Sequence, residues 1–178
     1  MSYARFASMI ATSTIVMFGL MYLNTYALDH ITFSQTRGWM AIVMGAVMAI
    51  IMLGFMWSMY QSRRINIAIL VGSTIAFTGA LWLVRSQETV NDASYMKAMI
   101  PHHSIAIMTS ERAKIRDQRV RRLADDIIAA QVREIAEMKA LIADLERNPT
   151  PDGAPLLPDY REKGLSSPDE PNEKGKGQ

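Results

Sequence analysis

The sequence predicts an all-α membrane protein, in which three transmembrane helices precede an external helical hairpin and a disordered tail. Three apolar runs, at about 6–28, 38–60 and 65–84, support the membrane part, because a helix needs ~20 apolar residues to cross a bilayer. None of these runs shows the polar face of a soluble core helix. Most charged residues follow residue 84, in segments with helical periodicity. We therefore expect a membrane domain at 1–84, a hairpin at 85–147 and a tail at 148–178.

The first apolar run has an alternative interpretation as a cleaved signal peptide that ends at Ala27. The residues before the run, however, contain Arg5 as their only basic residue, and the run is long for the apolar part of a signal peptide. We therefore expect this run to be a membrane span.

The short loops predict the orientation, because cytoplasmic loops are enriched in Lys and Arg. Arg5 precedes the first run, and Arg63 and Arg64 lie between the second and third runs. The intervening loop contains Arg37, whose charge is offset by Asp29. We expect a bacterial inner-membrane protein with a cytoplasmic N-terminus and a periplasmic or extracellular C-terminal arm.

Composition narrows the chemistry that the chain can perform. The sequence contains no cysteine but 14 methionines, so a site for a soft metal would use Met sulfur and His nitrogen. The net charge of +2 is too small and too scattered to indicate a nucleic-acid partner. We find no Ser/His/Asp set, no phosphate-binding loop and no acid–base pair of carboxylates, and we expect no enzymatic activity.

The hairpin is expected to consist of helices at about 92–114 and 118–147. Asn91 or Asp92 would cap the first helix, and Pro101 predicts a kink within it. The proline-rich segment after the second helix is typical of disorder. Two amphipathic helices bury little apolar surface alone, so the arm should pack on a second copy as half of a four-helix bundle, on the membrane domain, or on a partner.

Side chains that bind soft metals share one face of the first hairpin helix. On a helical wheel, Met96, Met99, His102 and His103 fall within roughly 60° of one direction. Met108 lies on the opposite side of an ideal helix, so it joins this face only if the kink redirects it, or it serves a neighbouring chain. The alternative is that these methionines are ordinary core residues and that the histidines form a hydrogen-bonded pair.

The second hairpin helix contributes Gln131, Glu134 and Met138, again on one face. Because Glu134 borders an apolar stripe, its carboxylate needs a cation or an imidazole as partner. A set of thioethers and imidazoles suits Cu(I) and, by extension, Ag(I).

Two segments, "MKAMIPHHSIAIM" at 96–108 and "LADDIIAAQVREIAEMKALI" at 123–142, resemble the DUF305 family. The resemblance covers about 92–146 and implies a ferritin-like fold, together with the periplasmic copper binding and metal tolerance of CopM-like members. Many members carry two copies of the motif and this chain carries one, which favours a homo-oligomer through the hairpin. The first two spans resemble the membrane-anchored branch of the family. The expected metal ligands are Met96, Met99, His102, His103, Met108, Glu134 and Met138.

The second apolar run contains a methionine at every fourth residue from Met40 to Met56. Its neighbouring face of Ala41, Gly45 and Ala49 favours helix packing, with methionine as flexible filler. Two alternatives are a thioether path that conducts Cu(I) and static metal binding within the membrane.

These observations predict a membrane-anchored protein that binds Cu(I) or Ag(I) for sequestration, handover or tolerance. The alternatives are a copper transporter that uses the methionines of the second run, and a non-metal interaction module. The expected partners are membrane lipid, a second copy of the chain and a copper-handling protein. Asp29 and His30 lie on the same side of the membrane as the arm; we expect them to be solvated, although they have the chemistry to join the site.

Overall fold

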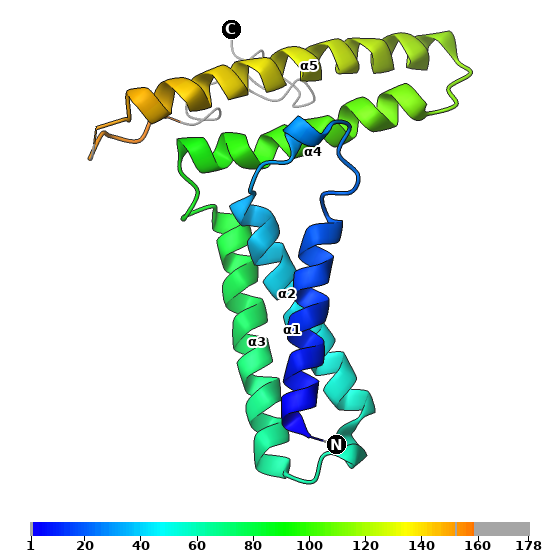
Figure 1. Cartoon of the computed structure of the whole chain (residues 1–178), viewed down its shortest axis with the longest axis vertical. Helices are drawn as coiled ribbons and strands as arrows, with labels where there is room; N and C mark the ends of the chain where they lie inside the picture. Colours follow the sequence, from blue (N-terminus) through cyan, green and yellow to red (C-terminus); the bar gives the residue numbers. More distant parts are fainter. Residues whose placement is uncertain (1, 152, 159–178) are drawn as a thin grey trace, which may run out of the picture.

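The computed structural model describes residues 2–151 and 153–158, and within them all regular structure is helical. The molecule is T-shaped, with three helices side by side in a stalk and two antiparallel helices as a crossbar (Figure 1). The prediction of an all-α chain is therefore confirmed. The helices are α1 (Tyr3–Leu20), α2 (Gln35–Phe55), α3 (Arg63–Ser86), α4 (Asp92–Arg112) and α5 (Gln118–Arg147).

The stalk helices α1, α2 and α3 are each long and apolar enough to cross a membrane. Each begins after a serine, at Ser2, Ser34 or Ser62, whose hydroxyl accepts a hydrogen bond from an N–H of the first turn. The first predicted run continued to residue 28, but α1 ends at Leu20. There the Arg37 guanidinium donates a hydrogen bond of 2.6 Å to the Met21 carbonyl, one of those that the helix end leaves free.

Helix α2 is the centre of the stalk, because α1 and α3 both pack against it. Its buried face includes Ala41, Gly45 and Ala49, the small residues expected at a helix contact. A Cβ atom at Gly45 would lie 2.4 Å from the Thr14 hydroxyl oxygen, so the glycine allows α1 to approach closely. The methionines from Met40 to Met56 are half-buried beside this face.

The far end of the stalk is held by a small polar network. The Tyr3 hydroxyl donates to Asn66 Oδ1 at 2.8 Å and accepts from the Ser62 N–H at 3.2 Å. The Asn66 amide in turn donates to the Tyr60 carbonyl at 3.3 Å. Because Asn66 is buried, these bonds satisfy polar groups that hydrocarbon would otherwise leave unpaired.

The crossbar is the predicted hairpin. Asn91 caps α4, α4 ends at Arg112 rather than at residue 114, and α5 has the predicted bounds. The two helices share an apolar core of Met96, Ile100, Ile107, Ile135 and Met138. The predicted disordered tail lies largely outside the described residues, and the described residues after α5 form no helix.

Pro101 fixes how the crossbar meets the stalk. Helix α4 continues through this proline, which has no N–H to donate to the Lys97 carbonyl four residues earlier. The Thr32 hydroxyl, from the loop between α1 and α2, donates to that carbonyl at 2.5 Å. The gap that proline leaves in the helical hydrogen bonding is thus filled by the membrane domain.

We expect Gly45→Ala to destabilise the stalk by about 1–3 kcal/mol, the usual cost of overpacking a tight contact. The added methyl group would meet the Thr14 side chain. Unfolding in mixed micelles, titrated with a denaturing detergent and followed by circular dichroism, measures the effect. Gly54→Ala is the matched control, because no atom lies within 4 Å of its added Cβ. Equal stability of the two variants would show that the α1–α2 contact is not close.

Candidate metal centre

A pocket of about 620 Å³ lies between α4 and α5. It contains five of the seven residues predicted as metal ligands. Met96, Met99 and His103 line it from α4, and Glu134 and Met138 line it from α5. Two segments some forty residues apart in the sequence thus provide one site, because the antiparallel hairpin aligns the start of α4 with the end of α5 (Figure 1).

The three methionines of the pocket also belong to the hydrophobic core. Met96 is 6% exposed and Met138 is 8% exposed, and Met99 packs against the same cluster while half-buried. The core and ligand interpretations of these residues are therefore compatible. The apolar contacts of the side chains hold three thioethers at the wall of one pocket.

His103 and Glu134 face each other across the pocket. His103 Nδ1 lies 3.1 Å from Glu134 Oε2, within ion-pair distance, but the geometry of the contact is not that of a hydrogen bond. The buried Nδ1 atom therefore has no hydrogen-bond partner within the described residues. Burial lowers the pKa of His103, with a smaller effect in the same direction from His102, while Glu134 opposes the shift. The neutral imidazole that a metal ligand requires is thereby favoured.

The structure does not bring His102 and Met108 to this pocket. His102 is exposed, with its ring centroid 6.1 Å from that of His103. On the helical wheel it lies at the edge of the shared face, and α5 does not reach that edge. Met108 is half-buried elsewhere on α4, as expected for its opposite position on the wheel. Gln131 is half-buried outside the pocket.

Three carboxylates that the sequence analysis did not select border the same pocket, namely Asp92, Glu137 and Asp144. Glu137 lies three residues and Asp144 ten residues after Glu134, so helical spacing alone would have placed them on its side of α5. Within the described part of the chain, no three His, Asp or Glu side chains form a group able to hold a metal. Metal binding here would therefore use methionine sulfur, and the carboxylates would make the pocket attractive to cations.

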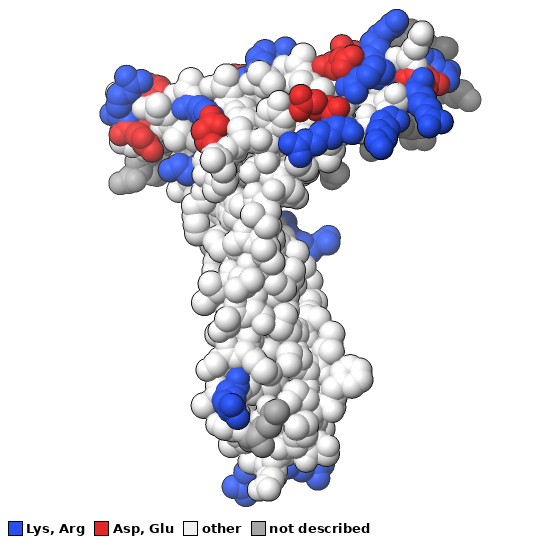
Figure 2. Space-filling model, turned by 45° about the vertical axis from the view of Figure 1, so that its right-hand side comes forward, with Lys and Arg blue, Asp and Glu red and all other residues white. Residues whose placement is uncertain are grey.

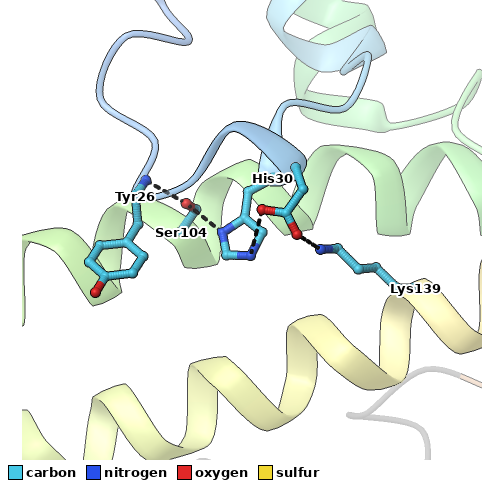
Figure 3. A network of polar contacts seen from close by, with 5 residues as sticks. Tyr26, His30, Ser104 and Lys139 are labelled. Carbon is cyan, nitrogen blue, oxygen red and sulfur yellow. Dashed lines mark hydrogen bonds and ion pairs between the residues drawn. The ribbon is translucent and has the colours of Figure 1, made fainter.

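Asp29 and His30 take part in a polar network that joins the stalk to the crossbar (Figure 3). Ser104, which is fully buried in α4, accepts from the Tyr26 N–H at 2.7 Å and lies 2.9 Å from His30 Nδ1. Asp29 Oδ2 binds Lys139 Nζ of α5 at 2.6 Å. The expectation that both residues are solvated was wrong for His30, whose side chain is 13% exposed. Neither residue lines the pocket.

Comparison with known families gives a match for the crossbar. Residues 92–177 match the family described as a domain of unknown function, DUF305. This part of the chain is a DUF305 domain. The domain contains α4, α5 and the metal-ligand candidates, and the match does not extend to the stalk.

Among curated proteins, an uncharacterized protein of Acanthamoeba polyphaga mimivirus is 39% identical over 64 residues, which cover 35% of this chain and 42% of that protein. The chain therefore matches less than half the length of this relative. No solved structure matches the chain.

We expect the attachment of the DUF305 domain to weaken in mild acid. Burial is the main cause that lowers the pKa of His30, Lys139 adds to it and Asp29 opposes it. Burial likewise lowers the pKa of His103. The unfolded chain therefore binds protons first as the pH falls below 6.5, the ordinary histidine value. The contribution of these histidines to the free energy of unfolding should be fully present above that pH. It should decline as the pH falls toward the lowered pKa values of the folded protein.

Thermal unfolding in detergent between about pH 7.5 and about pH 5 measures this dependence. His30→Gln should flatten it, because glutamine does not titrate, and the remaining slope should come from His103. His102→Gln is the control, because this side chain is exposed and lies outside the network that joins the stalk to the crossbar. A slope unchanged by His30→Gln would contradict the role given to His30.

Proposed function

We propose that this protein is a membrane-anchored binder of soft metal ions, Cu(I) foremost and Ag(I) by extension. The observation that carries the proposal is the pocket that Met96, Met99 and Met138 line together with His103 and Glu134. Its role would be sequestration or handover of the ion in metal tolerance, as in the CopM-like members that the chain resembles.

The donor set fits this ion. Thioether sulfur is a soft ligand that favours Cu(I), and imidazole nitrogen completes such sites. The buried Nδ1 atom of His103 has no hydrogen-bond partner within the described residues, a costly arrangement that a small shift of the imidazole toward Glu134 would relieve when Nε2 binds an ion. Zn²⁺, in contrast, prefers several nitrogen, oxygen or thiolate ligands, and the described residues offer no such group.

Each residue has a distinct task in this scheme. The methionine sulfurs bind the ion, and their core contacts keep them in place without a charge. Glu134, next to Nδ1 of His103, favours a proton on that nitrogen and so leaves Nε2 as the electron-pair donor. Asp92, Glu137 and Asp144 provide negative charge at the border of the pocket.

The stalk would anchor this pocket at a bacterial inner membrane, in the membrane-anchored branch of the family. Arg5, Arg63 and Arg64 favour a cytoplasmic position for the N-terminal end of the stalk by the positive-inside rule. The pocket would then face the periplasm, where a copper-handling partner could deliver or remove the ion.

A second copy of the chain is the partner that the exposed apolar side chains of the crossbar favour. Tyr95 and Leu141, at the wall of the pocket, are 55% and 47% exposed. Val120, Leu123 and Val132 on α5 are also exposed. Two such hairpins would form a four-helix bundle of ferritin-like type and would cover the open side of the pocket.

A competition titration of the full chain in detergent, with Cu(I) held by a chromophoric chelator, tests the proposal. We expect His103→Ala and Met99→Leu each to remove a ligand and to lower the affinity by at least about tenfold, which corresponds to about 1.4 kcal/mol of binding free energy. The loss should occur without a loss of helix content in circular dichroism.

His102→Ala and Met108→Leu are the matched controls, because they remove the same types of side chain outside the pocket. We expect them to retain the affinity of the unmodified protein. Equal affinity in all five proteins would refute the site. A loss in the controls alone would show that the metal binds outside the pocket and would equally refute the site.

A further inference from the structure

The turn between α4 and α5 carries a concentration of positive charge. Six of the eleven residues from 112 to 122 are basic, and Asp117 is the single acidic residue among them. Figure 2 shows Lys and Arg side chains gathered at one end of the crossbar, several of them along its lower edge, on the side of the stalk. The basic residues are Arg112, Lys114, Arg116, Arg119, Arg121 and Arg122.

Most of this charge is not neutralised within the described residues. Arg119 pairs with Asp117 at 2.8 Å, and Arg121 pairs with Asp125 at 2.7 Å. The side chains of Arg112, Lys114 and Arg116 are exposed, and none of them has an ion pair or hydrogen bond among the described contacts. Ion pairs among the described residues therefore neutralise only part of the positive charge of this cluster.

The turn extends sideways beyond the stalk (Figure 1). Helix α4 lies directly above the ends of the spans, because residues 87–91 alone separate it from α3. Near the turn, the Tyr26 hydroxyl of the α1–α2 loop donates to Glu111 at 3.3 Å, so the loop at the membrane end of the stalk reaches the residue next to Arg112. The basic turn thus projects over the region that the surrounding bilayer would occupy.

The α1–α2 loop also carries apolar groups suited to the membrane boundary. Leu23 is 77% exposed and Phe33 is 68% exposed, and the Phe33 ring lies 6.1 Å from the Phe18 ring of α1. Apolar side chains at the end of a span are stable at the junction of headgroups and acyl chains. In that position the loop would hold α4 close to the headgroup layer.

We propose that the α4–α5 turn binds the anionic phospholipid headgroups of the bilayer around the stalk, through Arg112, Lys114 and Arg116. Basic side chains beside a membrane are attracted to anionic lipid, and three of them act together here. The inference rests on the membrane anchoring proposed above and is independent of the metal site. The crossbar would then be held at two places: the α1–α2 loop would bind the middle of α4, and lipid headgroups would bind the α4–α5 turn.

The full, metal-free chain in lipid nanodiscs provides the test. Because the sequence contains no cysteine, Ala113→Cys places a single fluorophore at the exposed turn. Quenching by a headgroup-linked quencher reports the distance of the turn from the membrane. We expect stronger quenching with phosphatidylglycerol present than with phosphatidylcholine alone, and we expect high salt to abolish the difference.

The charge-removing variant is Arg112→Gln/Lys114→Gln/Arg116→Gln, in which the dependence on phosphatidylglycerol should disappear. The matched control removes the same charge from the crossbar outside the turn, in Lys97→Gln/Arg133→Gln/Arg147→Gln, and should keep the dependence. Equal quenching in both lipids, or equal loss in both variants, would overturn the proposal. Failure of the chain to enter either nanodisc would overturn the membrane anchoring itself and this inference with it, whereas loss of copper binding would affect neither.

Discussion

The free carbonyl of Lys97 is the constraint on which the arrangement of the two halves depends. Proline at position 101 removes its helical partner, and the Thr32 hydroxyl of the α1–α2 loop replaces that partner. One turn after Pro101, the buried Ser104 side chain contacts the same loop at the Tyr26 N–H and at the His30 ring. An unpaired carbonyl costs at most about 1–3 kcal/mol when it is fully buried, and because the Lys97 carbonyl is part-buried, the Thr32 contact favours one placement of the crossbar on the stalk by a part of that amount.

In this placement, two sides of α4 make different kinds of contact. The side that meets the α1–α2 loop carries the polar contacts of attachment, and the side that meets α5 carries the core around Ile100 and the methionines of the pocket. Because Ile100 is fully buried, the core fixes the spacing of the hairpin beside the pocket. Three thioethers thus lie at the wall of one pocket together with the His103 imidazole and the Glu134 carboxylate.

Local patterns in the sequence predicted much of this molecule. Apolar length predicted the three long apolar helices of the stalk, and periodicity with the Asn91 cap predicted α4 and α5. Spacing within the motifs predicted that Met96, Met99 and His103 share a face, but it could not show that α5 leaves His102 uncovered. The contact of His30 with Ser104 spans 74 residues, and that of Asp29 with Lys139 spans 110 residues. Such contacts depend on tertiary packing, as does the early end of α1, and no local pattern specifies them.

The central claim is that methionine sulfur of the DUF305 domain binds the metal, and X-ray absorption at the copper edge tests it most directly. The measurement identifies the atoms bound to copper in the Cu(I)-loaded full chain. The account predicts a shell dominated by thioether sulfur, with one imidazole nitrogen that disappears in His103→Ala. A shell of nitrogen and oxygen without sulfur would contradict it, because Met96, Met99 and Met138 would then be core residues alone.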